Sequence, residues 1–531
     1  MEELRAQGHE VEKFHDGSSE SRNGSADTSI EYPAKFKLIM IVVALVLSMF
    51  PAALDMTILS TAIPRITSDF NSLDDIGWYA SAFFLTVASF QSSWGKAYKY
   101  YPLKVVFLIS IGIFELGSLI CVEVGRAITG LGAAGVLSGC FTIIAFSVPP
   151  IMRPAFGGIL GATYGCASVV GPLLGGVFTS KLTWRWCFYI NLPIGGVAVA
   201  TIFFFFKTPQ GAIVANDITL SEKILQMDFP GAFLIMAGVI CYTLALQDGG
   251  VTRPWNSSRV IGLLVGFVLI TIAFGIVEYL QKDRALLLPR IMKDRTVLVC
   301  CAFISLLGAS FFVLLYYLPI YFQSVQGVSA SESGVRNLPL IISMTLFIIL
   351  CGGLLTAFGR FAPFLICGAV ITTVGSGLLY TLDVGSPSSQ WIGYQILAGI
   401  GLGLCFQIPV MSGQALAKAE DVATVTAILM FFQSIGGALF ISAAQAAFDN
   451  TLVAQILVHA PGIDPSSVIA VGATGLRDAF TPAQLPGILV AYMAALRVAY
   501  AIAIASGGAA AVVALFAPWT SIKGKVSVGA A

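Results

Sequence analysis

Three ionisable side chains stand inside otherwise apolar stretches of this 531-residue chain: Asp55, Glu115 and Arg126. A charge in a membrane span costs about 2.5–3.5 kcal/mol on insertion scales, so it usually faces a polar interior. A carboxylate whose burial and cationic neighbours change can bind and release a proton. We therefore expect Asp55, Arg126 and Glu115 to couple proton movement. Each residue also has a structural alternative. Asp55 would be an acid that caps a helix or pairs with a base, Arg126 would extend its side chain to the membrane interface, and Glu115 would be the structural partner of Arg126.

The segments that must position these residues are hydrophobic and long. The chain is 57% hydrophobic and 11% charged, and this charged share is less than half that of typical globular proteins. Fourteen apolar segments are each about 20 residues or longer, enough to cross a bilayer as a helix. They lie near 37–61, 78–98, 103–121, 124–147, 156–180, 186–206, 228–247, 258–280, 296–323, 337–357, 361–381, 391–416, 423–446 and 488–516.

The distribution of basic residues predicts the orientation of these spans. An even number of spans places both termini on one side. If that side is cytoplasmic, twenty of the 29 Lys and Arg residues lie in cytoplasmic segments and seven in outer ones. Cytoplasmic loops of membrane proteins carry the excess of Lys and Arg. We therefore expect both termini in the cytoplasm.

The fifth segment carries a glycine- and proline-rich run that is unusual inside a helix. Gly171, Pro172, Gly175 and Gly176, preceded by Gly158, resemble the antiporter motif of the major facilitator superfamily. Ala167 replaces a glycine that the motif expects. The sequence from 183 to 193, WRWCFYINLP after a threonine, resembles the fourteen-helix drug:proton antiporters of that superfamily. Residues 54–64 and 126–132 resemble two further motifs of that family, and the runs 317–323, 333–339 and 391–395 look most like its fungal members.

This resemblance implies an all-α polytopic membrane protein with the major facilitator fold, in which two six-helix halves are joined by two inserted helices. A weak internal repeat agrees, since 126–132 matches 395–401 and 172–178 matches 434–440. Parallel repeats around a central site are one transporter architecture. We expect a disordered cytoplasmic tail at 1–36, the N-terminal half at 37–206, a linker with the two extra helices at 207–295, the C-terminal half at 296–516 and a tail at 517–531.

Amides and aromatic rings in the second half suggest where a substrate binds. Amides in membrane helices either bond between helices or line a wet cavity, and aromatic side chains beside them suit flat lipophilic ligands. We expect a cavity lined by Tyr316, Tyr317, Gln407, Gln414, Phe432 and Gln433. For each residue taken singly, helix packing is the alternative.

The connection between the second and third segments departs from the family pattern. The superfamily carries a gating motif there, and its expected aspartate is replaced by Lys99. Lys96 and Lys104 add further positive charge. We therefore expect a simple positively charged cytoplasmic loop, without a gating network.

The sequence lacks the residue patterns that metal sites, nucleotide loops and nucleic-acid interfaces require. The three histidines lie outside the apolar segments, and the ten cysteines are scattered without metal spacing, which is typical of small buried hydrophobic residues. The glycine-rich stretches lack the GK[ST] ending of a nucleotide loop. A net charge of +1 gives no nucleic-acid footprint. We expect no cofactor, no metal, no nucleic-acid partner and no enzymatic activity.

The resemblance implies a secondary active efflux transporter that exports lipophilic drugs, toxins or secondary metabolites by proton antiport and alternating access. Its partners would be a lipophilic small molecule, protons and the lipid bilayer, and we expect a monomer in the plasma membrane, with the vacuolar membrane as the alternative. A second possibility is a facilitator or importer of the same fold, for sugars or siderophores.

A third possibility is a transport-impaired paralogue. Only Val122 to Gly125 separate the third segment from the Arg126 motif, fewer residues than the family usually has. This short connection predicts that Arg126 is pulled towards the membrane surface and loses its hold on Asp55 or Glu115.

Overall fold

The computed structural model describes residues 33–58, 66, 76–121, 123–149, 152–208, 219–519 and 521. Within these ranges the chain is α-helical. The N-terminal half contains α1 (Lys35–Leu54), α3 (Ile76–Tyr100), α4 (Leu103–Ile120), α5 (Glu123–Ser147), α6 (Arg153–Lys181), α7 (Trp186–Tyr189) and α8 (Asn191–Phe205). The linker contains α9 (Leu220–Leu225), α10 (Phe229–Asp248), α11 (Ser258–Gln281) and α12 (Pro289–Met292). The C-terminal half contains α13 (Arg295–Ile320), α14 (Ala330–Arg336), α15 (Leu338–Phe358), α16 (Ala362–Tyr380), α17 (Ser388–Cys405), α18 (Ile408–Leu416), α19 (Val422–His459), α20 (Pro465–Ala479) and α21 (Leu485–Ala514).

Each of the fourteen predicted segments coincides with helix. Thirteen helical stretches of the described chain are long and apolar enough to cross a membrane. The remaining segment is α3, a 25-residue helix that is more polar because serines and Gln91 interrupt it.

The predicted boundaries were wrong in four places. The segment 37–61 is helical only as far as Leu54 in the described residues, because a turn follows at 55–57. The segment 186–206 is broken into α7 and α8 at Ile190, and 391–416 is broken into α17 and α18 ahead of Pro409, because proline cannot donate the backbone hydrogen bond that would continue a helix. α19 continues to His459, 13 residues beyond the predicted end at 446, and α20 follows it. The sequence did not predict α20, because this helix is amphipathic and contains no long apolar run.

The two halves meet along two seams. Within the N-terminal half, α1 packs against α6 and α8, and α5 packs against α3 and α4. Within the C-terminal half, α13, α19 and α21 pack together, as do α15, α16 and α17. Contacts between halves run chiefly along α3 with α19 and along α6 with α15. A cavity between the halves is therefore bordered by helices from both.

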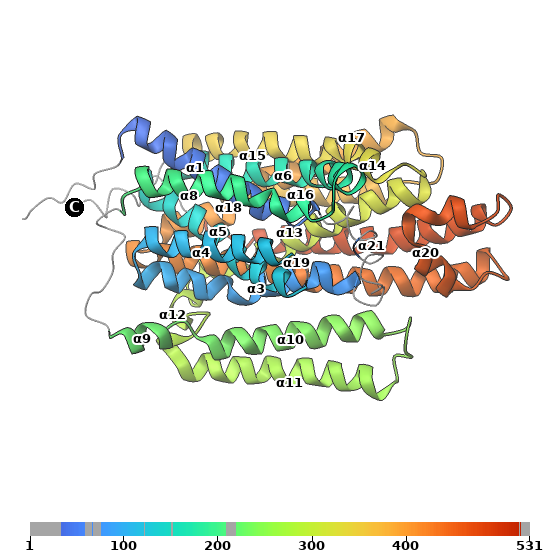
Figure 1. Ribbon diagram of the computed structural model, residues 1–531, viewed down its shortest axis with the longest axis horizontal. Helices are drawn as coiled ribbons and strands as arrows, with labels where there is room; N and C mark the ends of the chain where they lie inside the picture. The colour runs from blue at the N-terminus through green and yellow to red at the C-terminus, as the bar shows by residue number, and fades with distance from the viewer. Residues whose placement is uncertain are drawn as a thin grey trace, which may run out of the picture. The chain divides into compact units, whose positions relative to one another are not determined.

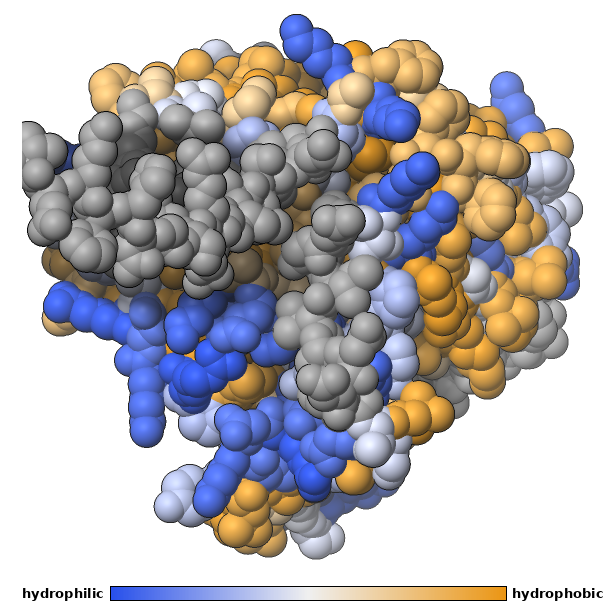
Figure 2. Space-filling model, turned by 90° about the vertical axis from the view of Figure 1, so that its left-hand side faces the viewer, coloured by the Kyte–Doolittle hydropathy of each residue, from blue (hydrophilic) through white to orange (hydrophobic). Residues whose placement is uncertain are grey.

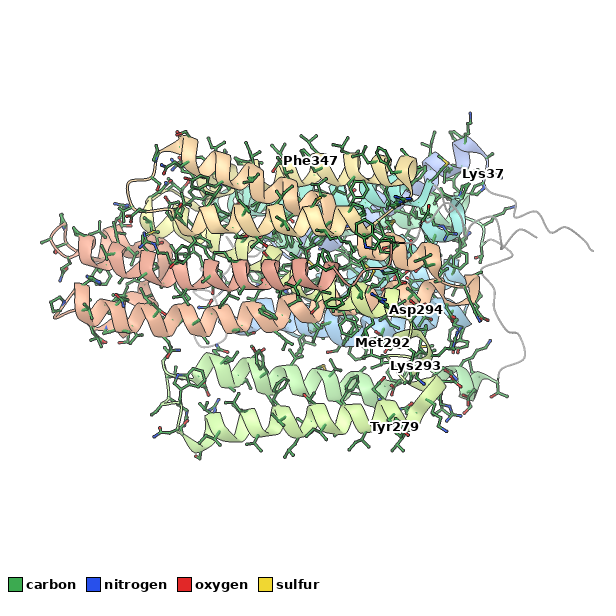
Figure 3. The ribbon with its side chains drawn as sticks, turned by 180° about the vertical axis from the view of Figure 1, so that it is seen from behind. Lys37, Tyr279, Met292, Lys293, Asp294 and Phe347 are labelled. Carbon is green, nitrogen blue, oxygen red and sulfur yellow. The ribbon has the colours of Figure 1, made fainter. Side chains whose placement is uncertain are left out.

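The inserted pair covers the first of these seams. α10 packs against both α3 and α19, whereas α11 packs mainly against α10 (Figure 1). A contact of 3.3 Å between the hydroxyls of Thr243 and Ser442 links α10 to α19. Tyr279 of α11 points away from the bundle and is 78% exposed (Figure 3). The apolar outer face of α11 is therefore available to lipid.

The start of α1 and the end of α21 lie at the same end of the helices. The rings of Phe36 in α1 and Phe205 in α8 are 6.1 Å apart, and Arg295 donates to the carbonyl of Phe516, just after α21, at 3.0 Å. Lys37 and Asp294 lie at this end in Figure 3. Figure 2 views the same end and shows hydrophilic side chains gathered on it, with hydrophobic ones along the flank. This arrangement agrees with an even number of spans.

The short connection after α4 does not displace Arg126. Cys121 takes a positive φ of 71° and α5 begins two residues later, while Val122 lies outside the described residues. The helices can turn so tightly because two glycines let them touch: a Cβ on Gly117 would lie 2.3 Å from the Thr129 nitrogen, and one on Gly125 would lie 2.8 Å from the Gly117 carbonyl oxygen. The prediction that Arg126 is drawn to the surface was wrong, because this side chain is buried in α5.

Candidate functional site

Asp55 and Arg126 form a buried ion pair in the N-terminal half. Asp55 ends α1, where its backbone N–H donates to the carbonyl of Pro51, and Arg126 lies in the first turn of α5. Nη1 of Arg126 donates to Oδ2 of Asp55, and each residue is only 1% exposed. The guanidinium also lies 4.5 Å from the centre of the Phe83 ring, where a cation is attracted to the π face. The two charges therefore neutralise each other away from solvent.

Glu115 lies near this pair but does not share it. Neither of its carboxyl oxygens accepts a hydrogen bond from the described residues, although both are buried. A Cβ on Gly195 of α8 would lie 1.8 Å from Oε1 of Glu115, so the absence of a side chain at Gly195 makes room for the carboxyl group. Isolated ionised carboxylates are very costly in an apolar site and take up a proton instead. Glu115 therefore does not pair with Arg126 among the described residues, and the alternative that it is the partner of Arg126 was wrong.

Asn191 completes the polar cluster, and the prediction from sequence did not include it. It begins α8, is fully buried, and donates to the Ser118 hydroxyl of α4 at 3.0 Å. Its amide oxygen and Oδ1 of Asp55 have no hydrogen-bond partner among the described residues. The signal was present in the sequence, because Asn191 is the asparagine of the run that resembles the fourteen-helix antiporters.

The antiporter-motif residues all belong to one continuous helix, α6, which packs against α1 and α15. A Cβ on Gly171 would lie 2.1 Å from the Thr57 hydroxyl, two residues after Asp55. A Cβ on Gly158 would lie 3.3 Å from the Ile348 carbonyl of α15. α6 therefore contacts both the end of the helix that carries Asp55 and the other half. Pro172, Gly175 and Gly176 lie between these contacts and the end of α6.

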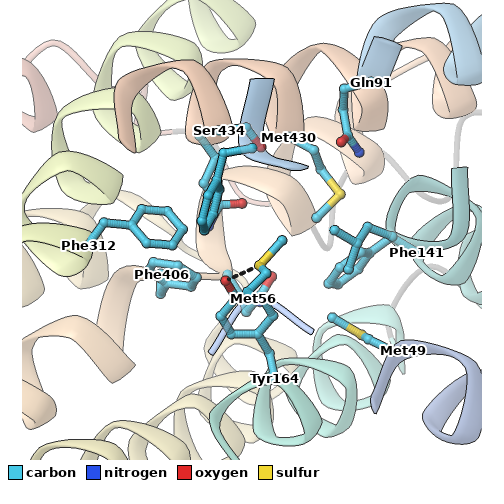
Figure 4. A pocket seen from close by; sticks show the side chains of 13 residues that line it. Met49, Met56, Gln91, Phe141, Tyr164, Phe312, Phe406, Met430 and Ser434 are labelled. Carbon is cyan, nitrogen blue, oxygen red and sulfur yellow. Dashed lines mark hydrogen bonds between the residues drawn. The ribbon is translucent and has the colours of Figure 1, made fainter. Parts of the chain in front are cut away.

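A small cavity lies between the halves (Figure 4). Its volume is about 40 Å³, close to the roughly 30 Å³ that one water molecule occupies in the liquid. Its walls are aromatic, thioether and amide groups: Met49, Met56, Phe84, Gln91, Leu137, Phe141, Tyr164, Phe312, Phe406, Gln407, Met430, Gln433 and Ser434. Tyr164 donates to the sulfur of Met56 at 3.0 Å (Figure 4). These lining residues carry no formal charge, which suits a neutral ligand.

The residues predicted to line a substrate cavity lie in different places. Gln407 and Gln433 line the cavity between the halves. Tyr317 does not line it, because it points from α13 towards Gln445, to which its hydroxyl donates at 3.2 Å. Gln414 does not line it either, because its Nε2 donates to the Thr426 hydroxyl at 2.8 Å and to the Phe141 carbonyl at 3.3 Å.

Tyr316 and Phe432 do not line the cavity either. The ring of Tyr316 is 6.4 Å from that of Phe84, which does line it, and the ring of Phe432 packs against that of Phe431. The lining residues that the prediction missed are mainly methionines and aromatics from both halves, which the sequence does not distinguish from ordinary packing residues.

Lys99 takes part in a charged network, contrary to the prediction of a simple positive loop. Its Nζ lies 3.0 Å from Oδ1 of Asp421, which precedes α19 in the other half. Arg290 of α12 binds both oxygens of the same carboxylate, at 2.5 and 2.9 Å. Asp421 is 4% exposed. One buried carboxylate therefore ties the N-terminal half, the linker and the C-terminal half together at the end where α1 begins.

The other lysines of this loop are also engaged. Lys96 is buried and donates to the Arg284 carbonyl of the linker at 2.5 Å. Lys104 donates to the Phe203 carbonyl of α8 at 2.7 Å. The prediction missed these partners because they are backbone carbonyls or lie about 100 to 320 residues away along the chain.

Comparison with known proteins agrees with this architecture. Residues 45–441 match the Major Facilitator Superfamily. The chain is 50% identical over 513 residues to an MFS-type transporter of Pestalotiopsis microspora, covering 95% of this chain and 94% of that one. It is 48% identical to a probable efflux pump of Penicillium aethiopicum, covering 94% and 91%, and 42% identical to an MFS-type efflux pump of Trichophyton rubrum, covering 96% and 97%.

Solved structures show the same fold at low sequence identity. The proton:xylose symporter XylE superposes with a TM-score of 0.57 at 13% identity, covering 92% of this chain and 97% of that one. The human organic anion transporter MFSD10 gives the same score and identity, covering 89% and 99%. At this identity the likeness concerns the fold alone. The match over most of the chain and the full-length relatives show that this protein belongs to the Major Facilitator Superfamily and is a multi-pass membrane transporter, not an enzyme.

Proposed function

We propose that this protein is a secondary active efflux transporter that exports lipophilic drugs, toxins or secondary metabolites by proton antiport and alternating access. The observation that carries the proposal is the Asp55–Arg126 ion pair, buried beside the unpartnered carboxyl group of Glu115. Relatives named as efflux pumps support the direction of transport.

The polar cluster supplies a proton-dependent switch. A proton that binds Asp55 cancels its attraction to Arg126, and the buried guanidinium then needs another anion. Glu115 can supply that anion by releasing its own proton. The cluster thus favours different pairings as protons arrive and leave, and each pairing changes how the end of α1 lies against α5.

The motion has a physical route to the substrate cavity. Gly171 of α6 touches Thr57, just after Asp55, and Gly158 of the same helix lies against α15 of the other half. A shift of the end of α1 therefore acts on α6 and on the seam between the halves. Since Met49 and Met56 flank Asp55 along the chain and line the cavity, protonation and cavity shape are directly linked.

Alternating access requires the cavity to open at one end at a time. The present cavity holds only about 40 Å³, far below the roughly 300–1,000 Å³ of typical ligand sites. We infer that the Lys99–Asp421–Arg290 network holds the end where α1 begins closed in this conformation, and that its release opens the cavity there. The excess of basic residues in segments at this end supports a cytoplasmic location for it.

The substrate should be neutral or weakly charged and lipophilic. The cavity walls offer thioether and aromatic groups together with three amides and two hydroxyls, without a formal charge among the residues that line it. Such walls fit a flat apolar molecule with a few hydrogen-bonding groups.

The test is efflux in proteoliposomes loaded with a neutral lipophilic dye such as Nile red. A pH gradient should drive dye movement in the direction opposite to that of protons, and dissipation of the gradient should abolish the concentrative movement. Dye accumulation in the same direction as protons would indicate the importer alternative, and movement independent of the gradient would indicate a facilitator.

A further inference from the structure

A second, open cavity lies in the C-terminal half, at the opposite end of the helices from the termini. Its volume is about 550 Å³, more than ten times that of the central cavity. We call it the α20 vestibule and define it by its lining residues: Val325, Gln326, Arg336, Val384, Gly385, Ser386, Ser388, Trp391, Arg477 and Leu489. All of them belong to the C-terminal half, and none lines the central cavity. The vestibule therefore lies outside the path proposed for the substrate.

Arg477 of α20 projects a positive charge into this space. Its Nη2 donates to the Val325 carbonyl at 2.9 Å. Gly327 makes this position possible, because its φ is 68° and a Cβ there would lie 1.8 Å from Nε of Arg477. Among the ion pairs of the described residues, none involves Arg477. A guanidinium has five N–H donors, so the one carbonyl leaves most of them available.

Arg336 of α14 supplies a second guanidinium in the same wall. Nη2 and Nε of Arg336 donate to Oε1 of Glu332 at 2.6 and 3.2 Å, and Nη1 donates to the amide oxygen of Gln326. Its backbone carbonyl accepts from the fully buried Gln395 at 3.0 Å. The position of Arg336 is therefore fixed from several sides.

The rest of the wall suits a molecule with an apolar part. Trp391 is almost fully buried, and its ring lies 5.8 Å from the guanidinium of Arg336. Val325, Val384 and Leu489 contribute aliphatic surface. The only formal charges among the lining residues are the two arginines. Glu332 and Asp383 lie nearby, but Glu332 is paired with Arg336 and Asp383 is 3.7 Å from Arg497.

We propose that the α20 vestibule binds an oxyanion, a phosphate or carboxylate group attached to an apolar body, through Arg336 and Arg477. Guanidinium groups bind both kinds of oxyanion with charge-assisted hydrogen bonds. Because every lining residue belongs to one half, the site keeps its shape while the halves move against each other. The bound molecule therefore stays in place through the transport cycle, as a stabilising or regulatory ligand rather than as cargo.

The test uses the purified full-length protein and two probes. Inorganic phosphate, titrated at constant ionic strength against chloride, tests a soluble anion by the shift in thermal unfolding midpoint. Nanodiscs of phosphatidylglycerol or phosphatidylcholine, followed by native mass spectrometry, test a lipid headgroup. The variants are Arg477→Gln and Arg336→Gln. Arg259→Gln is the matched control, because Arg259 is a half-exposed arginine that pairs with Asp248 at the insert.

The unmodified protein and Arg259→Gln should be stabilised by phosphate in a saturable way, or should retain phosphatidylglycerol over phosphatidylcholine. Each vestibule variant should weaken this binding roughly tenfold, the effect of losing one hydrogen bond to a charged group. A response to phosphate identifies a soluble anion, and a response to phosphatidylglycerol alone identifies a lipid headgroup. Equal binding by the vestibule variants and the control, or no saturable response to either probe, would overturn the proposal.

Asp55→Asn separates this inference from the proposed function. Asp55 lies in the other half, so this variant should bind both probes normally even when it no longer transports.

Discussion

Replacement of Asp55 by asparagine tests the coupling site most directly. Asparagine keeps the shape of the side chain and one hydrogen-bond acceptor, but it removes the carboxylate charge that pairs with Arg126. Because both residues are 1% exposed, the guanidinium would remain buried after losing this ion pair. Breaking a buried pair in this way costs about 3–5 kcal/mol. We expect the lower part of this range, because the amide oxygen and the Phe83 ring still contact Arg126.

Because the pair is buried, we expect this change to lower stability as well as to remove the titrating group. The thermal unfolding midpoint of Asp55→Asn should fall. The double variant Asp55→Asn/Arg126→Gln should recover most of the stability, because replacing both charges removes the unpaired one. Neither variant should couple dye efflux to a pH gradient, since neither has the titrating carboxylate.

The combination of readouts separates coupling from folding. If the double variant is as stable as the unmodified protein and still transports with the same pH dependence, Asp55 is a structural residue. If Asp55→Asn shows no loss of stability, the ion pair does not hold in the membrane and the switch has no basis. Glu332→Gln, which breaks an exposed ion pair within α14, is the control for loss of a carboxylate.

Three further predictions address other parts of the molecule. Gly195→Ala should strongly reduce coupled transport, because its methyl group would meet the Glu115 carboxyl group, whereas Gly196→Ala, with open space around it, should transport normally in the same assay. Asp421→Asn should speed amide hydrogen exchange at residues 417–421, because Lys99 and Arg290 lose their shared partner; unchanged exchange would refute the closing role. Gln433→Leu should change the range of dyes that inhibit efflux in a competition assay, whereas Gln445→Leu, which lies away from the cavity, should not.

The residues proposed to couple proton movement could be singled out in the sequence because charges are rare in membrane helices. Each of Asp55, Glu115 and Arg126 interrupts an apolar run, and the cost of an isolated charge there requires a partner or a proton. The sequence could not decide which acid pairs with Arg126. That choice depends on the approach of α1 to α5 and on the space left by Gly195, and neither follows from spacing along the chain.

Cavity residues were harder to predict, because residues within one turn of a helix can line the cavity or pack against a neighbouring helix. Tyr316 and Tyr317 are adjacent, yet they face different neighbours, because successive residues on a helix are about 100° apart. The sequence does not distinguish the amide of Gln414 from that of Gln407. In the structure, Nε2 of Gln414 donates to groups of α5 and α19. Without the rotation of each helix, composition does not identify the lining residues, and the amides and aromatics of the second half pointed to only one of the two halves that border the cavity.

Loop length proved a poor guide to the position of Arg126. The short connection to α5 suggested a displaced arginine and hence an impaired transporter. In the structure, Gly117 and Gly125 absorb the tight turn by letting α4 and α5 touch, while Arg126 is held by Asp55 and by the Phe83 ring of α3. The position of Arg126 is therefore set by its pairing with Asp55 inside the bundle, and the backbone accommodates this position at Gly117 and Gly125. The impaired-paralogue alternative therefore loses the physical argument that suggested it, and coupling through Asp55 stays a proposal that the variants above test.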